Sequence, residues 1–240
     1  MSEKEISRDP DRNPSLFGYN IGNGETNMPE YFQYGETEMD YLRKKDKILG
    51  DYIQKTGMIY REVDTDLFSS VIHHIIGQQI SNKAQATIWN RIRENRKEIT
   101  PDSIASCSRD LLQSFGMTYW KADNILDFAR KARSGEFDIE SVKTMSDKDA
   151  IVYLSSLKGI GVWTAEMILL FSLERKDIFS YDDLAIQRGL RILYHHRKIT
   201  RKLFEKYRRR FSPYCSIASL YLWKISGQTT SSDEKKEGKI

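Results

Sequence analysis

The stretch LKGIGVWTAEMILLF, residues 157–171, constrains the fold more than any other part of the chain. It joins two helix-compatible runs through Gly159 and Gly161, and a new helix is expected from about Val162. Glycine adopts backbone angles that other residues avoid, and it adds no side chain to a tight connection. The stretch therefore predicts two helices joined by a hairpin turn of a few residues.

A turn of this kind can bind an anion. The first N–H groups of the second helix lack partners within the helix, and the helix dipole favours negative charge there. Lys158 adds a cation, and main-chain contacts to a phosphodiester are blind to base sequence. A purely structural alternative remains open, in which Gly159 only stops a helix and Gly161 only tightens the turn.

The rest of the chain also has the periodicity of helices. In residues 65–77 and 117–132 the apolar positions recur at spacings of three and four. No stretch alternates in steps of two between hairpin turns, so strands are not expected. We predict an all-α fold. Its expected helix starts are Thr65, Thr100 (with Pro101 at the first helical position of a helix over 100–115), Ser146 and Pro213.

Composition restricts the class of protein. The chain has 240 residues, of which 39% are hydrophobic and 30% charged, enough to bury a core and to cover it with a polar surface. Residues 1–28 and 227–240 lack helical or strand periodicity, which predicts a flexible leader and a flexible tail around a domain at 29–226. No apolar run approaches the roughly 18 residues of a membrane span, and the charged N-terminus is unlike a signal peptide. An intracellular protein without a membrane partner is expected.

Charge and cysteine content say less. Cys107 and Cys215 are too few for a disulfide framework or a four-cysteine metal site. The net charge is only +4, but residues 188–210 contain a basic run in which Glu205 is the only acid. That run is either a solvated face or a surface that contacts phosphates.

The motif LKGIGVWTA, followed after one helix by IFSYDDLAIQRGL, resembles the helix-hairpin-helix (HhH-GPD) DNA glycosylase superfamily. The resemblance includes IIGQQIS at 75–81 and FGMTYWKADNI at 115–125, and it covers roughly residues 30–226. It implies a two-lobed helical fold with the active cleft between the lobes. One lobe is a six-helix bundle of about residues 65–175, and the other combines 29–64 with 176–226.

Within this superfamily the chain is most similar to the 3-methyladenine DNA glycosylase II branch. Trp163 stands where bifunctional branches carry a Schiff-base lysine, Trp223 matches an aromatic of the alkylpurine pocket, and no cysteine quartet follows the last helix. The resemblance implies a monofunctional enzyme of base excision repair. It would hydrolyse the N-glycosidic bond of alkylated purines and leave an abasic site.

The chemistry needs a negative charge near the sugar, because the deoxyribose develops oxocarbenium character as the bond breaks. The family pattern assigns this role to Asp183, and Asp182 is expected to cap the helix. A cationic base would be held by electron-rich aromatic faces. The resemblance implies a base pocket of Trp163, Trp223, Met167 and Leu184, to which Tyr119 and Trp120 are further candidates.

Double-stranded DNA with damaged bases is the expected partner of a monomeric protein. Gln78 or Gln79 would fill the gap left by the flipped nucleotide, and Ser81 would cap the next helix. The other expected DNA contacts are Lys158, Gly159, Ile160, Gly161 and Thr164. No cofactor is expected, although the family turn binds a monovalent cation through main-chain carbonyls, here those of Leu157 and Ile160.

Three points stay open. The pairs His73–His74 and His195–His196 do not have the spacing of a metal site. Cys215 occupies a position where the branch often has a basic residue, and Met167 and Leu184 replace pocket aromatics. The alternatives are therefore a glycosylase for another lesion, such as uracil, hypoxanthine or an oxidised purine, or a hairpin module that binds DNA without catalysis.

Overall fold

The computed structural model describes the backbone of residues 30–237 and the side chains of residues 30–228; the expected leader at 1–28 lies outside these residues. The described elements are α1 (Glu36–Lys45), α2 (Lys47–Thr56), α3 (Leu67–Gly77), α4 (Asn82–Asn95), α5 (Pro101–Ala105), α6 (Arg109–Ser114), α7 (Tyr119–Ser134), the 3-10 helix η1 (Glu140–Thr144), α8 (Asp147–Ser155), α9 (Val162–Ser172), α10 (Leu184–Tyr194), α11 (Arg201–Phe211) and α12 (Cys215–Glu237). The described part of the chain contains no strand, only an isolated bridge between Tyr31 and Glu62. The predicted all-α class is confirmed.

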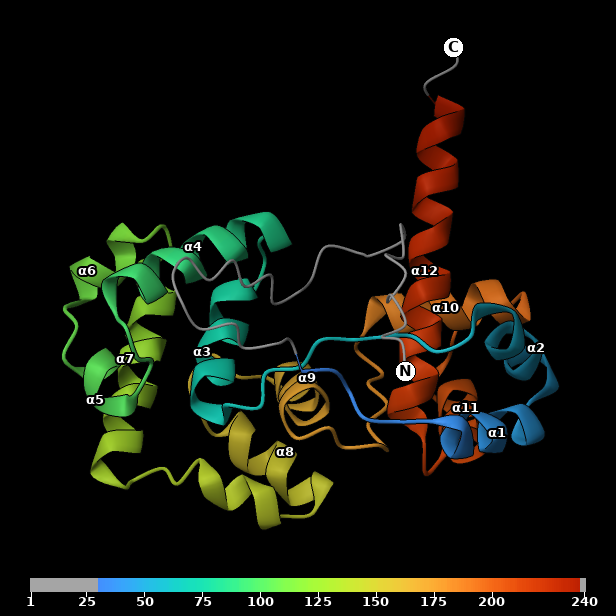
Figure 1. Cartoon of the computed structure of the whole chain (residues 1–240), viewed down its shortest axis with the longest axis horizontal. Coiled ribbons are helices and arrows are strands. Elements are labelled where there is room, and N and C mark those ends of the chain that lie inside the picture. The colour runs from blue at the N-terminus through green and yellow to red at the C-terminus, as the bar shows by residue number, and fades with distance from the viewer. Residues whose placement is uncertain (1–29, 238–240) are drawn as a thin grey trace, which may run out of the picture.

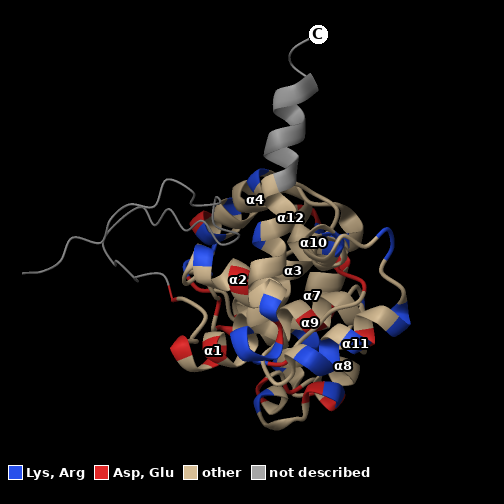
Figure 2. Cartoon of the chain, turned by 90° about the vertical axis from the view of Figure 1, so that its right-hand side faces the viewer, with Lys and Arg blue, Asp and Glu red and all other residues tan. Residues whose placement is uncertain are grey.

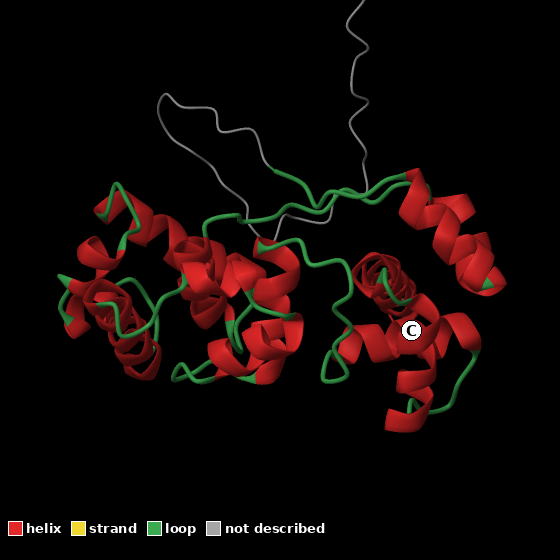
Figure 3. Cartoon of the chain, turned by 90° about the horizontal axis from the view of Figure 1, so that it is seen from below, coloured by secondary structure: helices red, strands yellow, loops and turns green. Residues whose placement is uncertain are grey.

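The helices form two groups that share the central helix α9. Figure 1 shows α3 to α8 on one side and α1, α2, α10, α11 and α12 on the other, and Figure 3 shows the same division from below. Chain segments far apart in sequence therefore build the second group. Its N-terminal helices α1 and α2 pack against the C-terminal helices α11 and α12.

Side-chain caps define where most helices begin, and they correct two predictions. Asp66, not Thr65, caps α3 by accepting a hydrogen bond from Ser69 N, because Asp66 stands directly before the first helical residue, Leu67. The helix expected over 100–115 is two helices, since Ser108 caps a second start by accepting from Leu111 N. The expected caps Thr100 and Ser146 are confirmed.

Helices α10 and α12 cross closely enough to exclude any side chain at Gly189. A Cβ at that position would lie 2.3 Å from the main-chain oxygen of Leu222. Both residues are buried. This contact places the second turn of α10 beside the part of α12 that carries Trp223.

The end of the chain differs from the prediction of a tail without regular structure from Gly227. Helix α12 starts at Cys215, two residues after the predicted start, and continues to Glu237. Because the buried part of α12 already supplies the nucleus, each further residue adds a backbone hydrogen bond at little cost. No helix among the described residues is long and apolar enough to cross a membrane.

Candidate functional site

Asp183 is the N-cap of α10. Its Oδ1 accepts hydrogen bonds from Ala185 N and Ile186 N, both at 2.9 Å, and the residue is only 7% exposed. The prediction that Asp182 caps this helix is wrong: Asp182 is exposed one residue too early. Asp183, the residue expected to stabilise the sugar cation, is thus also the residue that caps α10, so the helix N-terminus fixes its carboxylate.

Two indoles complete the shell of this carboxylate. Nε1 of Trp163, on the first turn of α9, donates to Oδ2 at 3.1 Å. Nε1 of Trp223, on α12, donates to Oδ1 at 3.2 Å. Oδ1 therefore accepts three hydrogen bonds and Oδ2 one, and Asp183 forms no ion pair among the described residues. Oδ2, which accepts a single hydrogen bond, can offer its remaining lone pairs and its negative charge to a nearby cation.

The two tryptophans differ in their surroundings. Trp163 is 41% exposed, so it has a free surface. Trp223 is partly buried and stacks on Phe171 with ring centroids 5.6 Å apart and an interplanar angle of 23°. The guanidinium of Arg61 lies 4.9 Å from the Phe171 centroid, and burial lowers the pKa of Arg61 to about 10. One ring is therefore backed by protein, whereas the other faces outward.

The remaining pocket candidates are spread out. Met167 is buried at 3% exposure, while Leu184 is 78% exposed on the surface next to Asp183. Tyr119 and Trp120 are exposed at the start of α7, where Arg109 stacks over Tyr119. Met167 is thus the buried member of these four candidates, and the other three are exposed. The assignment of Met167 and Leu184 to base binding remains a prediction.

The glycine turn has the predicted hairpin form, with α9 starting at Val162. Gly159 has a φ of 82°, and a Cβ there would lie 2.5 Å from Nδ2 of Asn124. Gly161 differs from the expectation: its φ is −89°, which any residue adopts, and a Cβ would meet nothing within 4 Å. The first glycine is therefore required by the fold, and the second leaves open space in front of the helix.

The start of α9 lacks a side-chain cap, because its N-cap residue is Gly161. Among the described helices α2 to α11, each α-helix other than α9 has a side chain that accepts a hydrogen bond from its first turn. Uncapped N–H groups and the helix dipole together favour an anion. This arrangement fits the predicted phosphate contact of the turn.

The side chains around the turn have distinct places. Lys158 is exposed and pairs with Asp127 at 3.3 Å, a weak surface contact that a phosphate can replace. Ile160 and Leu157 are buried and anchor the turn, and the Leu157 carbonyl accepts a hydrogen bond from Ile160 N. The predicted DNA contact of Thr164 is corrected in part. Its side chain is buried, so only its main chain is left to contact a phosphate.

The two glutamines expected to fill the gap left by a flipped nucleotide, Gln78 and Gln79, point in different directions in the loop after α3. Gln78 is turned inward, and its Nε2 donates to the carbonyl of Gly159 at 2.7 Å. Gln79 is exposed with a φ of 58°, the left-handed region that non-glycine residues rarely adopt. Ser81 caps α4 as predicted, accepting a hydrogen bond from Ala84 N. Gln79 is thus the glutamine at the loop tip.

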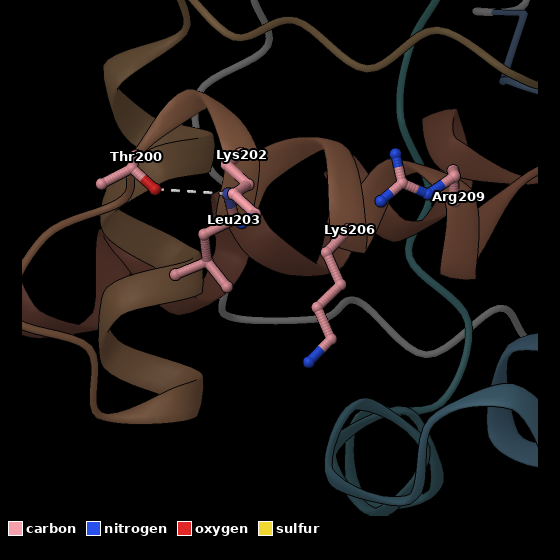
Figure 4. A pocket seen from close by; sticks show the side chains of 5 residues that line it. All are labelled: Thr200, Lys202, Leu203, Lys206 and Arg209. Carbon is pink, nitrogen blue, oxygen red and sulfur yellow. Dashed lines mark hydrogen bonds between the residues drawn. The ribbon is translucent and has the colours of Figure 1, made fainter.

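Half of the basic residues on α11 are paired with acids. Arg201, Arg208 and Arg210 pair with Glu205, Asp177 and Asp46 respectively. The others, Lys202, Lys206 and Arg209, form no ion pair among the described residues; they share one helix face around a hollow of about 280 Å³, completed by Thr200 and Leu203 (Figure 4). Figure 2 shows basic residues on α10 and α11 on this side of the molecule.

The paired histidines and the cysteines are structural. His73 and His74 lie in the interior of the α3 group, where burial lowers the pKa of His73 to about 3 and that of His74 to about 4. Nε2 of His196 and the hydroxyl of Tyr207 lie within hydrogen-bond distance at 2.7 Å. Burial raises the pKa of the Cys215 thiol. Within the described residues no group of three His, Cys, Asp or Glu side chains is placed to hold a metal.

Sequence reasoning missed three residues that hold the site together. Gly189 allows α10 and α12 to cross, and Asn124 packs against Gly159. Lys121 is buried and donates to the carbonyl of Ile76, at the end of α3, and to that of Gln78, in the loop that follows. All three residues lie within the motifs that carry the family resemblance, but only Gly189 has a local signal of its own, because a glycine inside a helix is unfavourable unless space demands it.

Comparison with known proteins gives concordant matches. The family model described as HhH-GPD superfamily base excision DNA repair protein matches residues 72–213. The chain is 32% identical over 185 residues to DNA-3-methyladenine glycosylase 1 of Schizosaccharomyces pombe, covering 75% of this chain and 79% of the relative. It is 24% identical to the putative DNA-3-methyladenine glycosylase YfjP of Bacillus subtilis, covering 84% and 80%.

Solved structures agree in fold. The chain superposes on a DNA-3-methyladenine glycosidase from Bacillus halodurans with a TM-score of 0.74 and 29% identity, covering 84% of this chain and 94% of the other. A Schizosaccharomyces pombe 3-methyladenine DNA glycosylase in complex with abasic DNA gives a TM-score of 0.70 and 28% identity, covering 78% and 95%.

Proposed function

Since the chain belongs to the HhH-GPD superfamily of base excision DNA repair proteins, we propose that it is a monofunctional DNA glycosylase for alkylated purines in double-stranded DNA. It acts as a hydrolase of the 3-methyladenine DNA glycosylase type and leaves an abasic site. The observation that carries the proposal is the carboxylate of Asp183, held by two indole N–H groups and a helix N-terminus close to the uncapped glycine turn.

The first step is binding of the damaged strand. The uncapped start of α9 and Lys158 bind a phosphate through main-chain N–H groups and charge, without reading the base sequence. The target nucleotide then leaves the stack, which takes a few kcal/mol. Gln79, at the tip of the loop after α3, fills the gap.

The second step is cleavage of the bond from C1′ to the base nitrogen. The electron pair leaves with the base, and an alkylated purine that carries positive charge is a good leaving group. The sugar becomes an oxocarbenium ion, which the charge on Oδ2 of Asp183 stabilises. A water molecule adds its oxygen to C1′ and releases a proton to solvent or to the carboxylate. Because position 163 is Trp, no lysine there competes with water.

The base is selected by aromatic surfaces. The exposed ring of Trp163 offers an electron-rich face to a cationic base. The buried Met167 and the exposed Leu184 make the proposed base-binding site less aromatic. This favours a second candidate function, in which the substrate is a different lesion, such as hypoxanthine, uracil or an oxidised purine. A panel of duplexes, each with one lesion, separates the two readings.

The decisive experiment measures base release from duplex DNA treated with a methylating reagent, with and without alkali. The intact protein is expected to release methylated purines and to leave sites that break only in alkali. D183N is expected to lose about a hundredfold or more in rate, as for removal of one transition-state stabiliser. D182N is the matched control, because Asp182 is exposed and caps nothing. Strand breaks without alkali would contradict a monofunctional mechanism.

We also infer that the protein works without a cofactor, because carboxylate, water and phosphate contacts supply the whole reaction. We further propose that it is an intracellular monomer, since the proposed substrate is cellular DNA and the proposed site residues all belong to one chain. A monovalent cation held by the carbonyls of Leu157 and Ile160 would strengthen the phosphate contact. Exchange of potassium for tetramethylammonium at constant ionic strength tests this, since DNA affinity should then fall while folding is unchanged.

A further inference from the structure

Lys121 occupies an unusual position for a lysine. It lies on the first turn of α7, is 6% exposed, and forms no ion pair among the described residues. Its Nζ donates to the carbonyl of Ile76 at 2.8 Å and to that of Gln78 at 2.6 Å. Burying an ammonium without a carboxylate is unfavourable, and the negative end of the α3 dipole offsets only part of that. Burial accordingly lowers the pKa of Lys121.

The two carbonyls bound by Lys121 flank the point where α3 ends at Gly77 and the loop to α4 begins. The next residue, Gln79, is exposed and held in the left-handed region with a φ of 58°. That conformation costs about 1 to 2 kcal/mol for a residue with a Cβ, so the surroundings must impose it. The ammonium of Lys121 supplies two of the bonds that do so.

The same loop is tied to the glycine turn. Nε2 of Gln78 donates to the carbonyl of Gly159 at 2.7 Å, while Asn124, one turn after Lys121 on α7, packs against Gly159. Helix α7 therefore contacts both the start of the loop after α3 and the glycine turn. The distance between the two is set by α7 rather than by either loop alone.

We propose that Lys121 is a positioning residue for nucleotide flipping: it holds the Gln78–Gln79 loop at a fixed distance from the glycine turn. The proposal rests on the proposed function, because it concerns the step before base release. A loop already held in the inserted geometry does not lose conformational freedom when it enters the duplex. The benefit therefore applies to lesions that must be unstacked and unpaired.

The test compares two substrates in single-turnover base release. One duplex carries 7-methylguanine opposite cytosine, and the other carries 7-methylguanine opposite a tetrahydrofuran abasic analogue, where no base pair has to open. K121M is expected to lose about tenfold or more in rate on the paired lesion and less than about twofold on the unpaired one. K131M is the matched control, since Lys131 lies on the same helix and is partly exposed.

Equal losses by K121M on both duplexes, or no loss on either, would overturn the proposal. K121Q removes the buried charge but keeps a hydrogen-bond donor, so it should show the same preference for the unpaired lesion to a smaller degree. K121Q replaces K121M in the test if circular dichroism shows that K121M does not fold. Failure of the proposed function looks different, because the intact protein would then release 7-methylguanine from neither duplex.

Discussion

Nε1 of Trp163 lies 3.1 Å from Oδ2 of Asp183. The indole of Trp163 is thus bonded to the carboxylate that we assign to catalysis. The same side chain offers an exposed aromatic face to the base. We therefore propose two separable roles for this tryptophan, orientation of the carboxylate through its N–H and contact with the base through its ring.

Substitutions at Trp163 separate these roles. W163F keeps an aromatic face but leaves Oδ2 without its only side-chain donor, so the rate of base release should fall about tenfold with little change in KM. W163A removes the ring as well and should also raise KM. W120F is the control, because Trp120 is exposed beside the turn, and the indoles that donate to Asp183 are those of Trp163 and Trp223. An unchanged kcat in W163F would show that the indole N–H is dispensable.

The two glycines of the turn should respond differently to alanine. G159A forces a Cβ into the left-handed region and against Asn124, so the free energy of unfolding should fall by about 2 to 4 kcal/mol. G161A should leave the unfolding free energy nearly unchanged, because its Cβ would point into open space. It should nevertheless weaken DNA binding about tenfold, since that space is where a phosphate approaches.

Urea unfolding and fluorescence anisotropy with a labelled duplex measure the two effects. G159A combined with N124A should recover part of the lost stability, because the clash is relieved while the backbone conformation stays unfavourable. A G161A protein that binds DNA as tightly as the unmodified chain would show that phosphate does not approach the start of α9.

The crossing of α10 and α12 should not tolerate a side chain at Gly189. G189A places a Cβ 2.3 Å from the main-chain oxygen of Leu222, so the helices must separate at a cost of about 1 to 3 kcal/mol. Separation moves Trp223 away from Asp183, and base release should fall together with the melting temperature. G227A, on α12 with nothing within 4 Å of its Cβ, should not lower the melting temperature.

Stability should depend on pH through the buried histidines. His73 and His74 are neutral in the folded protein, with burial lowering their pKa values to about 3 and about 4, whereas an unfolded histidine has a pKa of about 6.5. Below pH 6.5 the unfolded chain takes up protons that the folded chain does not. The free energy of unfolding should therefore decrease by up to about 1.4 kcal/mol per pH unit for each histidine as pH falls towards 4.

Urea unfolding at pH 7, 6 and 5 measures this dependence. H74L removes one of the two groups, so its decrease should be about half as steep as that of the unmodified chain. H195N is the control, because His195 is exposed in a left-handed position that asparagine also adopts. Parallel curves for H74L and the unmodified chain would mean that folding does not lower the pKa of His74.

Local patterns were enough to predict the helices and the turn. The apolar spacing, the caps at Thr100, Ser81 and Ser146, and the helix start at Val162 all depend on residues a few positions apart, and the structure has them as predicted. The cap assignments to Thr65 and to Asp182 were wrong, because in each case the next residue, Asp66 or Asp183, also has a side chain that can cap and takes the position.

The site itself required tertiary structure. The family resemblance named Asp183, Trp163 and Trp223, but it did not show how they meet. The crossing of α10 and α12 at Gly189 brings Trp223 to Asp183, and the packing of α9 brings Trp163 there. Lys121 reaches the loop after α3 from 43 residues further along the chain. A sequence determines which residues can cap, turn or carry charge, since these are short-range properties. Which of them meet is decided by how the helices pack, because packing joins atoms that no local spacing relates.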